Sequence, residues 1–117
     1  MKKKTKLRIN CFYKVYGGQP HPAYIFAYDK NHKTYISLKF GTTKGRHMIE
    51  IHPIQNRYSH SFVRNRPYEG TRKDYGDKEL LGMFLDARDQ TVFDNIKIKK
   101  PDRSASARKR YKENSKK

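Results

Sequence analysis

Hydrophobic side chains recur at every second position through the first half of the chain, which is the pattern of half-buried β-strands. The alternation is clearest over 34–42, where Ile36, Leu38 and Phe40 share one face. The predicted strands cover residues 7–16, 23–28, 34–42, 47–54 and, after a polar stretch, 61–65. Because their connections are short, we expect the first four to form an antiparallel meander. Residues 80–85 are apolar again and fit either a last strand or a segment that docks on the core.

A change from a period of two to a helical spacing follows Asp86. This side chain can accept hydrogen bonds from the free N–H groups of a first helical turn. Phe93 and Ile96 form part of a narrow apolar stripe that would pack on the sheet, and Pro101 would stop the helix. The spacing predicts one helix over about 87–100.

These patterns predict an α+β, mainly β fold. We expect a small curled antiparallel sheet or partial barrel of four to six strands, with one C-terminal helix and basic disordered tails. A chain of 117 residues allows a single domain, expected at 7–100, with a basic N-terminal arm at 1–6 and a tail at 101–117.

Charge changes the picture most. The chain has 28 Lys and Arg against 11 Asp and Glu, a net charge of +17. Residues 1–8 hold five basic residues and no acid, and residues 99–117 hold nine against two, which leaves +5 on the body. Solubility of a small domain needs only roughly 2–8 charges. A charge this large raises the local anion concentration, so a polyanion is the expected partner.

The C-terminal tail is poor in apolar residues and rich in Ser, Lys and Arg. Such a segment buries too little surface to offset the entropy of ordering it, so we expect disorder in the free protein. Ser104–Ala107 would also allow the basic run to extend as a short helix along a groove.

The chain contains one cysteine, Cys11, so no intramolecular disulfide can form. The Lys-rich start is not followed by an uninterrupted apolar run, and no stretch reaches the eighteen or so apolar residues that span a bilayer. The sequence therefore predicts a cytoplasmic protein without a membrane partner.

Basic residues interleaved with aromatic ones are the strongest chemical signal. Bases stack on aromatic faces while Lys and Arg neutralise phosphates, so the pattern predicts nucleic-acid binding. RNA or the ribosome is favoured over DNA, because an exposed sheet is expected and no helix resembles a major-groove reader. The predicted contacts are Tyr35, Lys39, Arg46, Arg57, Tyr58, Arg64, Arg66, Arg72, Lys73, Arg108, Lys109 and Arg110.

Two other functions fit the same composition. His52, His60 and Arg64 could supply the base, acid and cation of a metal-independent endoribonuclease of the toxin–antitoxin type. Alternatively, the protein is an adaptor that docks on an acidic protein partner.

Metal and cofactor motifs are not expected. One cysteine and no pair of histidines at helical i, i+4 spacing exclude the familiar zinc patterns. No glycine-rich phosphate loop is present, so the sequence predicts no cofactor.

Overall fold

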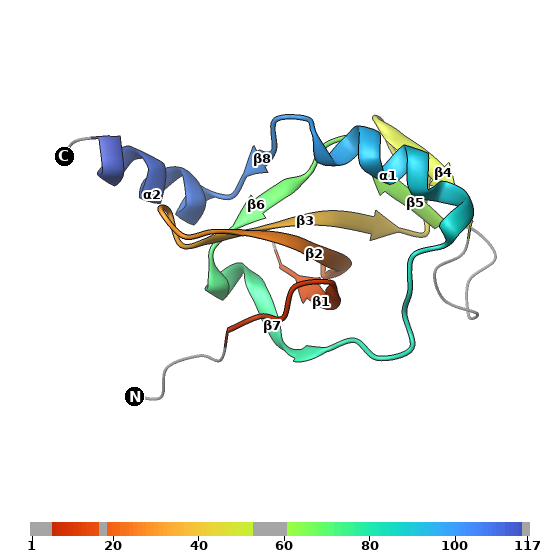
Figure 1. Ribbon diagram of the computed structural model, residues 1–117, viewed down its shortest axis with the longest axis horizontal. Coiled ribbons are helices and arrows are strands. Elements are labelled where there is room, and N and C mark those ends of the chain that lie inside the picture. The colour runs from red at the N-terminus through yellow and green to blue at the C-terminus, as the bar shows by residue number, and fades with distance from the viewer. Residues whose placement is uncertain (1–5, 17–18, 53–60, 116–117) are drawn as a thin grey trace.

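The structure is a computed structural model that describes residues 6–16, 19–52 and 61–115. An eight-stranded sheet forms its body, and a helix lies toward each end of the longest axis (Figure 1). The strands are β1 (Cys11–Val15), β2 (His21–Asp29), β3 (Thr34–Gly41), β4 (Met48–Ile51), β5 (Ser61–Arg64), β6 (Tyr68–Gly70), β7 (Tyr75–Glu79) and β8 (Asp102–Arg103). The helices are α1 (Gln90–Lys97) and α2 (Ala105–Ser115), with 3-10 turns at Arg72–Asp74 and Ala87–Asp89. The prediction of a mainly-β fold built on an antiparallel sheet is confirmed.

The sheet is open, and its strand order is β4-β5-β3-β2-β1-β7. Strands β1, β2 and β3 form the predicted antiparallel meander. The predicted place of the fourth strand is wrong, because β4 pairs with β5 and β5 pairs with β3. β6 then follows the same edge of β3 at Tyr35↔Gly70, and β8 pairs with β6 in parallel. The chain from 61 to 70 therefore covers almost the whole outer edge of β3.

The first strand is shorter than the alternation predicts. Asn10 has φ 68, a left-handed conformation that Asn tolerates better than most residues, and β1 begins only after it. Leu7 is instead held by its backbone N–H, which donates to Tyr35 Oη at 3.1 Å. The segment before Cys11 thus crosses the sheet face rather than continuing β1.

Both faces of the sheet are buried. One face carries a core cluster of Phe12, Leu38, Phe40, Ile51, Val63, Phe93 and Ile96. The opposite face carries a second cluster of Leu7, Tyr13, Val15, Ala23, Ile25, Tyr35 and Tyr75. A register shift between Ile25 and Ala27 separates Tyr24, which packs against the first cluster, from Tyr28, whose ring lies 4.8 Å from that of Tyr35. The sheet therefore offers no open aromatic platform along its middle.

The segment from 80 to 97 covers the first cluster. Leu80, Met83 and Leu85 pack against it without forming a strand, which agrees with the docking alternative for this segment. Phe93 and Ile96 of α1 are fully buried in the cluster, as the apolar stripe predicts. The helix is shorter than expected, since a 3-10 turn occupies 87–89.

The predicted disordered tail is instead ordered over 101–115. Ser104 accepts a hydrogen bond from the backbone N–H of Ala107, which caps the start of α2, and Ala107 is fully buried. Tyr111 stacks on His32 with ring centroids 3.6 Å apart and planes 7° apart. The composition of the tail hides these contacts, because their partners come from distant parts of the chain.

No helix in the described part of the chain is long and apolar enough to cross a membrane.

Candidate nucleic-acid interface

A basic hollow lies where β2 begins and where β3 and β5 end. Its volume is about 520 Å³, and its titratable lining residues are His21, Lys39, Arg46 and Arg64. No acidic side chain is among its described lining residues. Phe40, Met48 and Met83 add apolar wall, together with proline and threonine residues. We call this the β3–β5 hollow.

Strand register places three of these side chains on one face of the sheet. Ala23 of β2 lies opposite Lys39, and Gly41 of β3 lies opposite Phe62 of β5. Because side chains two positions apart share a face, His21, Lys39 and Arg64 all point the same way. This is the face of the second core cluster, which gives way here to polar side chains. Three adjacent strands thus present basic groups to one hollow.

The positive groups of the β3–β5 hollow lie close enough to repel one another. Burial, followed by the nearby charges of Lys39 and Arg64, lowers the pKa of His21. Burial and the Arg64 charge also lower the pKa of Lys39, which Asp102 partly offsets. Arg64 lies 3.8 Å from Asp102, and both side chains are about half exposed, so this pair neutralises little. A bound phosphate would relieve the repulsion among these groups.

A smaller hollow adjoins the first across Arg64. It has a volume of about 420 Å³ and is lined by His47, Arg64, Asn65, Arg66, Lys99 and Asp102. The Lys99 ammonium donates to Asn65 Oδ1 at 2.6 Å, and the Arg66 guanidinium donates to the carbonyl of Lys100 at 3.4 Å. The basic surface therefore extends from the end of β5 toward the segment after α1.

The structure brings together only some of the residues predicted to bind nucleic acid. Lys39, Arg46 and Arg64 line the β3–β5 hollow, and Arg66 lines the adjoining one. Tyr35 is 5% exposed between the rings of Tyr28 and Tyr75, so it cannot stack on a base. The alternation of apolar and polar residues along β3 predicts one buried face and one exposed face. It gave no sign that both faces are buried.

The remaining predicted contacts lie elsewhere. Arg72, Lys73, Lys109 and Arg110 line a separate hollow at the opposite end of β3. Arg108 is exposed on α2. Arg57, Tyr58 and His60 lie outside the described residues.

His52, the described histidine of the ribonuclease hypothesis, takes part in a structural contact. Its backbone N–H and its ring Nδ1 reach the two carboxylate oxygens of Asp89 at 2.8 and 2.9 Å. Asp89 is 5% exposed and precedes α1, so the pair ties the end of β4 to the start of the helix. The neighbouring carboxylates of Asp86 and Asp89 would repel an RNA phosphate.

We expect His52→Ala to lower the free energy of unfolding by about 1 kcal/mol, because the ring hydrogen bond to the buried Asp89 carboxylate is lost. Urea unfolding of the folded protein measures this change. His47→Asn is the matched control, since His47 is exposed and Asn suits its left-handed φ of 62. Equal stability of the two variants would contradict the structural role.

His52, Asp86 and Asp89 are the group in the described part of the chain whose possible metal-ligand atoms lie close together. One ligand atom each of His52, Asp86 and Asp89 lies within 4.8 Å of the others. Both Asp86 oxygens already accept from Arg88, whose guanidinium lowers the pKa of that carboxyl to about 2. Protein donors therefore already occupy the carboxylate oxygens of this group.

Sequence reasoning missed His21 and Lys99 as residues of the basic surface. His21 follows a Gly- and Pro-rich turn, which draws attention to the turn rather than to the first residue of β2. Only the pairing of β2 with β3 shows that His21 shares a face with Lys39. The alternation of side chains along a strand places His21 on the same face as Ala23. It does not show which neighbouring strand lies beside His21.

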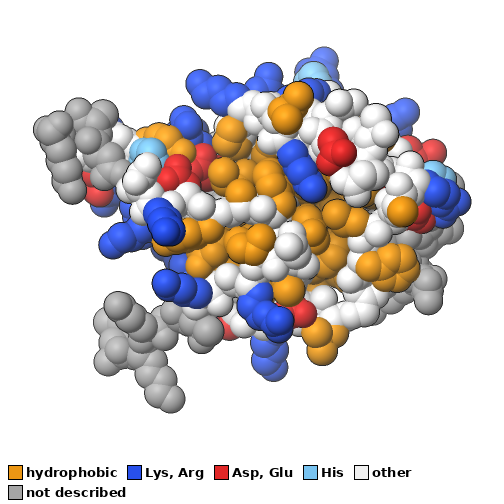
Figure 2. Space-filling model, viewed as in Figure 1, with side chains coloured by type: hydrophobic (Ala, Val, Ile, Leu, Met, Phe, Trp, Pro, Cys, Tyr) orange, Lys and Arg blue, Asp and Glu red, His pale blue; other side chains and the backbone are white. Residues whose placement is uncertain are grey.

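Figure 2 shows the distribution of charge on the face seen in Figure 1. Hydrophobic side chains gather in the middle, and most Lys and Arg side chains lie toward the outline. On this face, the basic side chains therefore lie mainly around the hydrophobic surface rather than within it.

No protein-family model matches the chain, and neither the curated proteins nor the solved structures include a match to it.

Proposed function

We propose that the protein binds nucleic acid through the β3–β5 hollow, with RNA preferred over DNA. The observation that carries this proposal is the convergence of His21, Lys39 and Arg64 on one sheet face, in a hollow whose described lining includes no acid. Phosphate oxygens are the ligands that such unneutralised cations favour.

The preference for a single strand over a duplex rests on the shape of the hollow. Sequence-specific RNA recognition mostly uses single-stranded segments whose bases are splayed out into pockets. A concave site of about 520 Å³, with Met48, Met83 and Phe40 beside the cations, suits an unstacked nucleotide better than the outside of a duplex.

Fluorescence anisotropy with labelled single-stranded RNA, single-stranded DNA and duplex DNA across a salt series tests the proposal. We expect the highest affinity for RNA, and a logarithmic plot of affinity against salt with a negative slope. Lack of binding to all three at low salt would overturn it. A polyglutamate competitor that displaces RNA at equal charge concentration would favour the acidic-protein adaptor instead.

Metal-independent RNA cleavage is the second candidate, and the position of His21 favours it. Neither ring nitrogen of His21 has a hydrogen-bond partner among the described residues, and burial lowers the pKa of the imidazole, which favours the neutral form that can accept a proton. His21 would accept the proton of a 2′-hydroxyl while the 2′-oxygen forms a bond to phosphorus. The P–O5′ bond would break, with Lys39 donating a proton to the leaving oxygen.

If this cleavage occurs, RNA incubated without metal is expected to yield a 2′,3′-cyclic phosphate and a 5′-hydroxyl. His21→Gln should reduce the rate by at least about a hundredfold while RNA stays bound, because it removes the general base. Lys78→Gln, at an exposed position of β7 outside the hollows, serves as the control. Mass spectrometry of the products checks the chemistry, and RNA that stays intact with folded wild-type protein excludes the activity.

A further inference from the structure

A second basic hollow lies at the opposite end of β3. It has a volume of about 610 Å³, and residues from the N-terminal segment, the β2–β3 hairpin, the 71–73 turn and α2 line it. Its basic residues are Lys6, Lys33, Arg72, Lys73, Lys109 and Arg110. Glu113 is the one acid among its described lining residues. We call this the α2 hollow.

The four lysines of this hollow form no ion pair within the described part of the chain. Among the described residues, no carboxylate lies within ion-pair distance of Lys6, Lys33, Lys73 or Lys109. Arg72, by contrast, lies 2.9 Å from Asp77. The ammonium groups of this hollow therefore remain available to an external anion.

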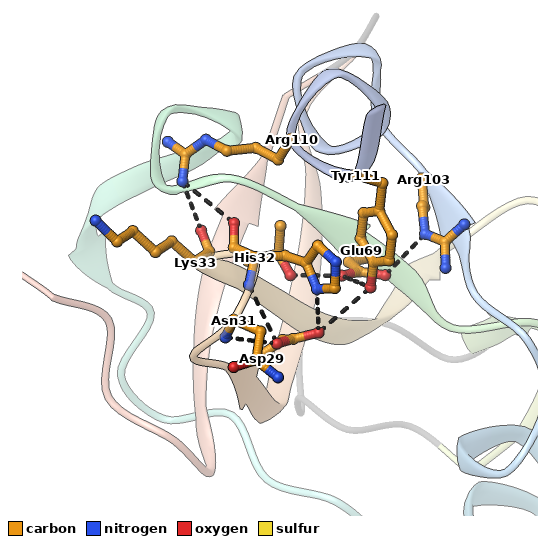
Figure 3. A network of polar contacts seen from close by, with 9 residues as sticks. Asp29, Asn31, His32, Lys33, Glu69, Arg103, Arg110 and Tyr111 are labelled. Atoms are coloured by element: carbon orange, nitrogen blue, oxygen red, sulfur yellow. Dashed lines mark hydrogen bonds and ion pairs between the residues drawn. The ribbon is translucent and has the colours of Figure 1, made fainter. Parts of the chain in front are cut away.

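A buried network holds the helical wall of the α2 hollow in place (Figure 3). Glu69 is fully buried, and its carboxylate accepts from Thr34, from Arg103 Nε at 3.2 Å and from Tyr111 Oη at 2.7 Å. Burial and then the Glu69 contact raise the pKa of Tyr111 to about 12, so its hydroxyl remains a donor at neutral pH.

The hairpin tip is fixed to α2 in the same region. The Arg110 guanidinium donates to the carbonyls of His32 and Lys33, both at 3.3 Å, as Figure 3 shows. Asp29 accepts from His32 and Tyr111. The helix and the hairpin tip are thus joined before any ligand binds, which lowers the entropy cost of binding.

β3 connects the two hollows. Lys33 precedes its first residue and belongs to the α2 hollow, while Lys39 lies near its end and belongs to the β3–β5 hollow. Six residue steps at roughly 3.3 Å each separate them by about 20 Å along the strand. Neighbouring phosphates of one nucleic-acid chain lie much closer together than this, so a ligand of only a few nucleotides reaches one hollow at a time.

We propose that the α2 hollow binds a second stretch of the phosphate backbone of the nucleic acid held in the β3–β5 hollow. This inference rests on the proposed function. It identifies the ligand as a strand long enough to span both hollows, and it assigns the α2 hollow to backbone phosphates rather than to bases.

The double variant Lys73→Gln/Lys109→Gln tests the inference. Its control is Lys14→Gln/Lys78→Gln, which removes the same charge from exposed lysines of β1 and β7 outside both hollows. Affinities for a twenty-nucleotide RNA are measured by anisotropy across a salt series, and those for a trinucleotide by NMR titration at low salt. Circular dichroism verifies that both variants fold.

We expect the test variant to bind the long RNA roughly tenfold more weakly at moderate salt. The salt slope should fall by about 1.4, because each lost phosphate contact on a single strand contributes about 0.7. The trinucleotide affinity should stay unchanged, and the control should leave both ligands unaffected.

Two results would overturn the inference while leaving the proposed function intact. One is an equal loss of long-RNA affinity in the test and control variants, which would mean a general effect of charge. The other is unchanged long-RNA affinity in the test variant. Failure of the wild-type protein to bind long RNA would instead refute the proposed function itself.

Discussion

The double substitution Lys39→Gln/Arg64→Gln is expected to weaken RNA binding by roughly a hundredfold. Each side chain would make a charge-assisted contact of at least about 1.5 kcal/mol with a phosphate oxygen, and about 1.4 kcal/mol corresponds to a factor of ten. Both residues face the β3–β5 hollow. Fluorescence anisotropy with a single-stranded RNA at fixed salt measures the loss.

The same variant should fold about as stably as the wild type, because loss of the Lys39 Nζ contact with the Tyr68 ring, 4.6 Å away, opposes the relief of charge repulsion. Lys39 is half-buried beside Arg64, and the two positive charges oppose each other in the free protein. The ion pair of Arg64 with Asp102 is too exposed to offset this repulsion by much. Urea unfolding separates a binding defect from a folding defect. Lys14→Gln/Lys78→Gln has the same change in charge, and equal losses of affinity in the two variants would refute a specific site.

Glu69→Gln is expected to lower the free energy of unfolding by about 3 kcal/mol, because it breaks the ion pair of a fully buried carboxylate with Arg103, whose side chain is 27% exposed. The three donors around the Glu69 carboxylate are Thr34, Arg103 and Tyr111. The Glu69 carboxylate accepts these hydrogen bonds with both of its oxygens. The Gln side chain has only one acceptor oxygen, because its amide nitrogen donates, so it cannot accept from all three. The loss should be measured by thermal or urea unfolding.

Detachment of α2 is the expected structural consequence. A helix of 11 residues is marginal in water by itself, so it depends on its contacts with the sheet. Limited trypsin digestion should then cut at Arg108–Arg110 faster than in the wild type. Glu79→Gln is the control, since it removes the same charge from a carboxylate that contacts Cys11 and, at 3.5 Å, the exposed Arg8, neither of which belongs to α2. Wild-type stability and protease resistance in Glu69→Gln would contradict the anchoring role of the network.

Elements that leave a local pattern in the sequence were predicted, and elements that depend on distant contacts were not. The strands of the meander and the apolar stripe of α1 were visible because burial on one face leaves a local period in the sequence. β6 and β7 lie in a polar, Arg- and Tyr-rich segment, so their pairing with β3 and β1 left no such period. The left-handed Asn10 and the register shift after Ile25 also broke the regular alternation.

The candidate site was predicted in part, for the same reason. Lys39, Arg46, Arg64 and Arg66 were identified as basic residues of the body, and they contribute to the two hollows that meet at Arg64. Tyr35 was predicted to be an open platform, but the second core cluster covers it. His21 lies between two prolines in a turn-like sequence, so no strand pattern indicated that it shares a hollow with Lys39 and Arg64.

Composition and hydrophobic pattern by themselves determined that this chain is a small, mainly β protein with a charge suited to a polyanion. Strand periodicity is a local property of the sequence, and net charge is a sum over its residues. The tertiary structure alone decided where that charge is gathered. Pairing of β2, β3 and β5 placed His21, Lys39 and Arg64 on one face, and the buried Glu69 anchored α2 beside the β2–β3 hairpin. Both arrangements depend on contacts between residues far apart in sequence, and a local pattern carries no record of such contacts.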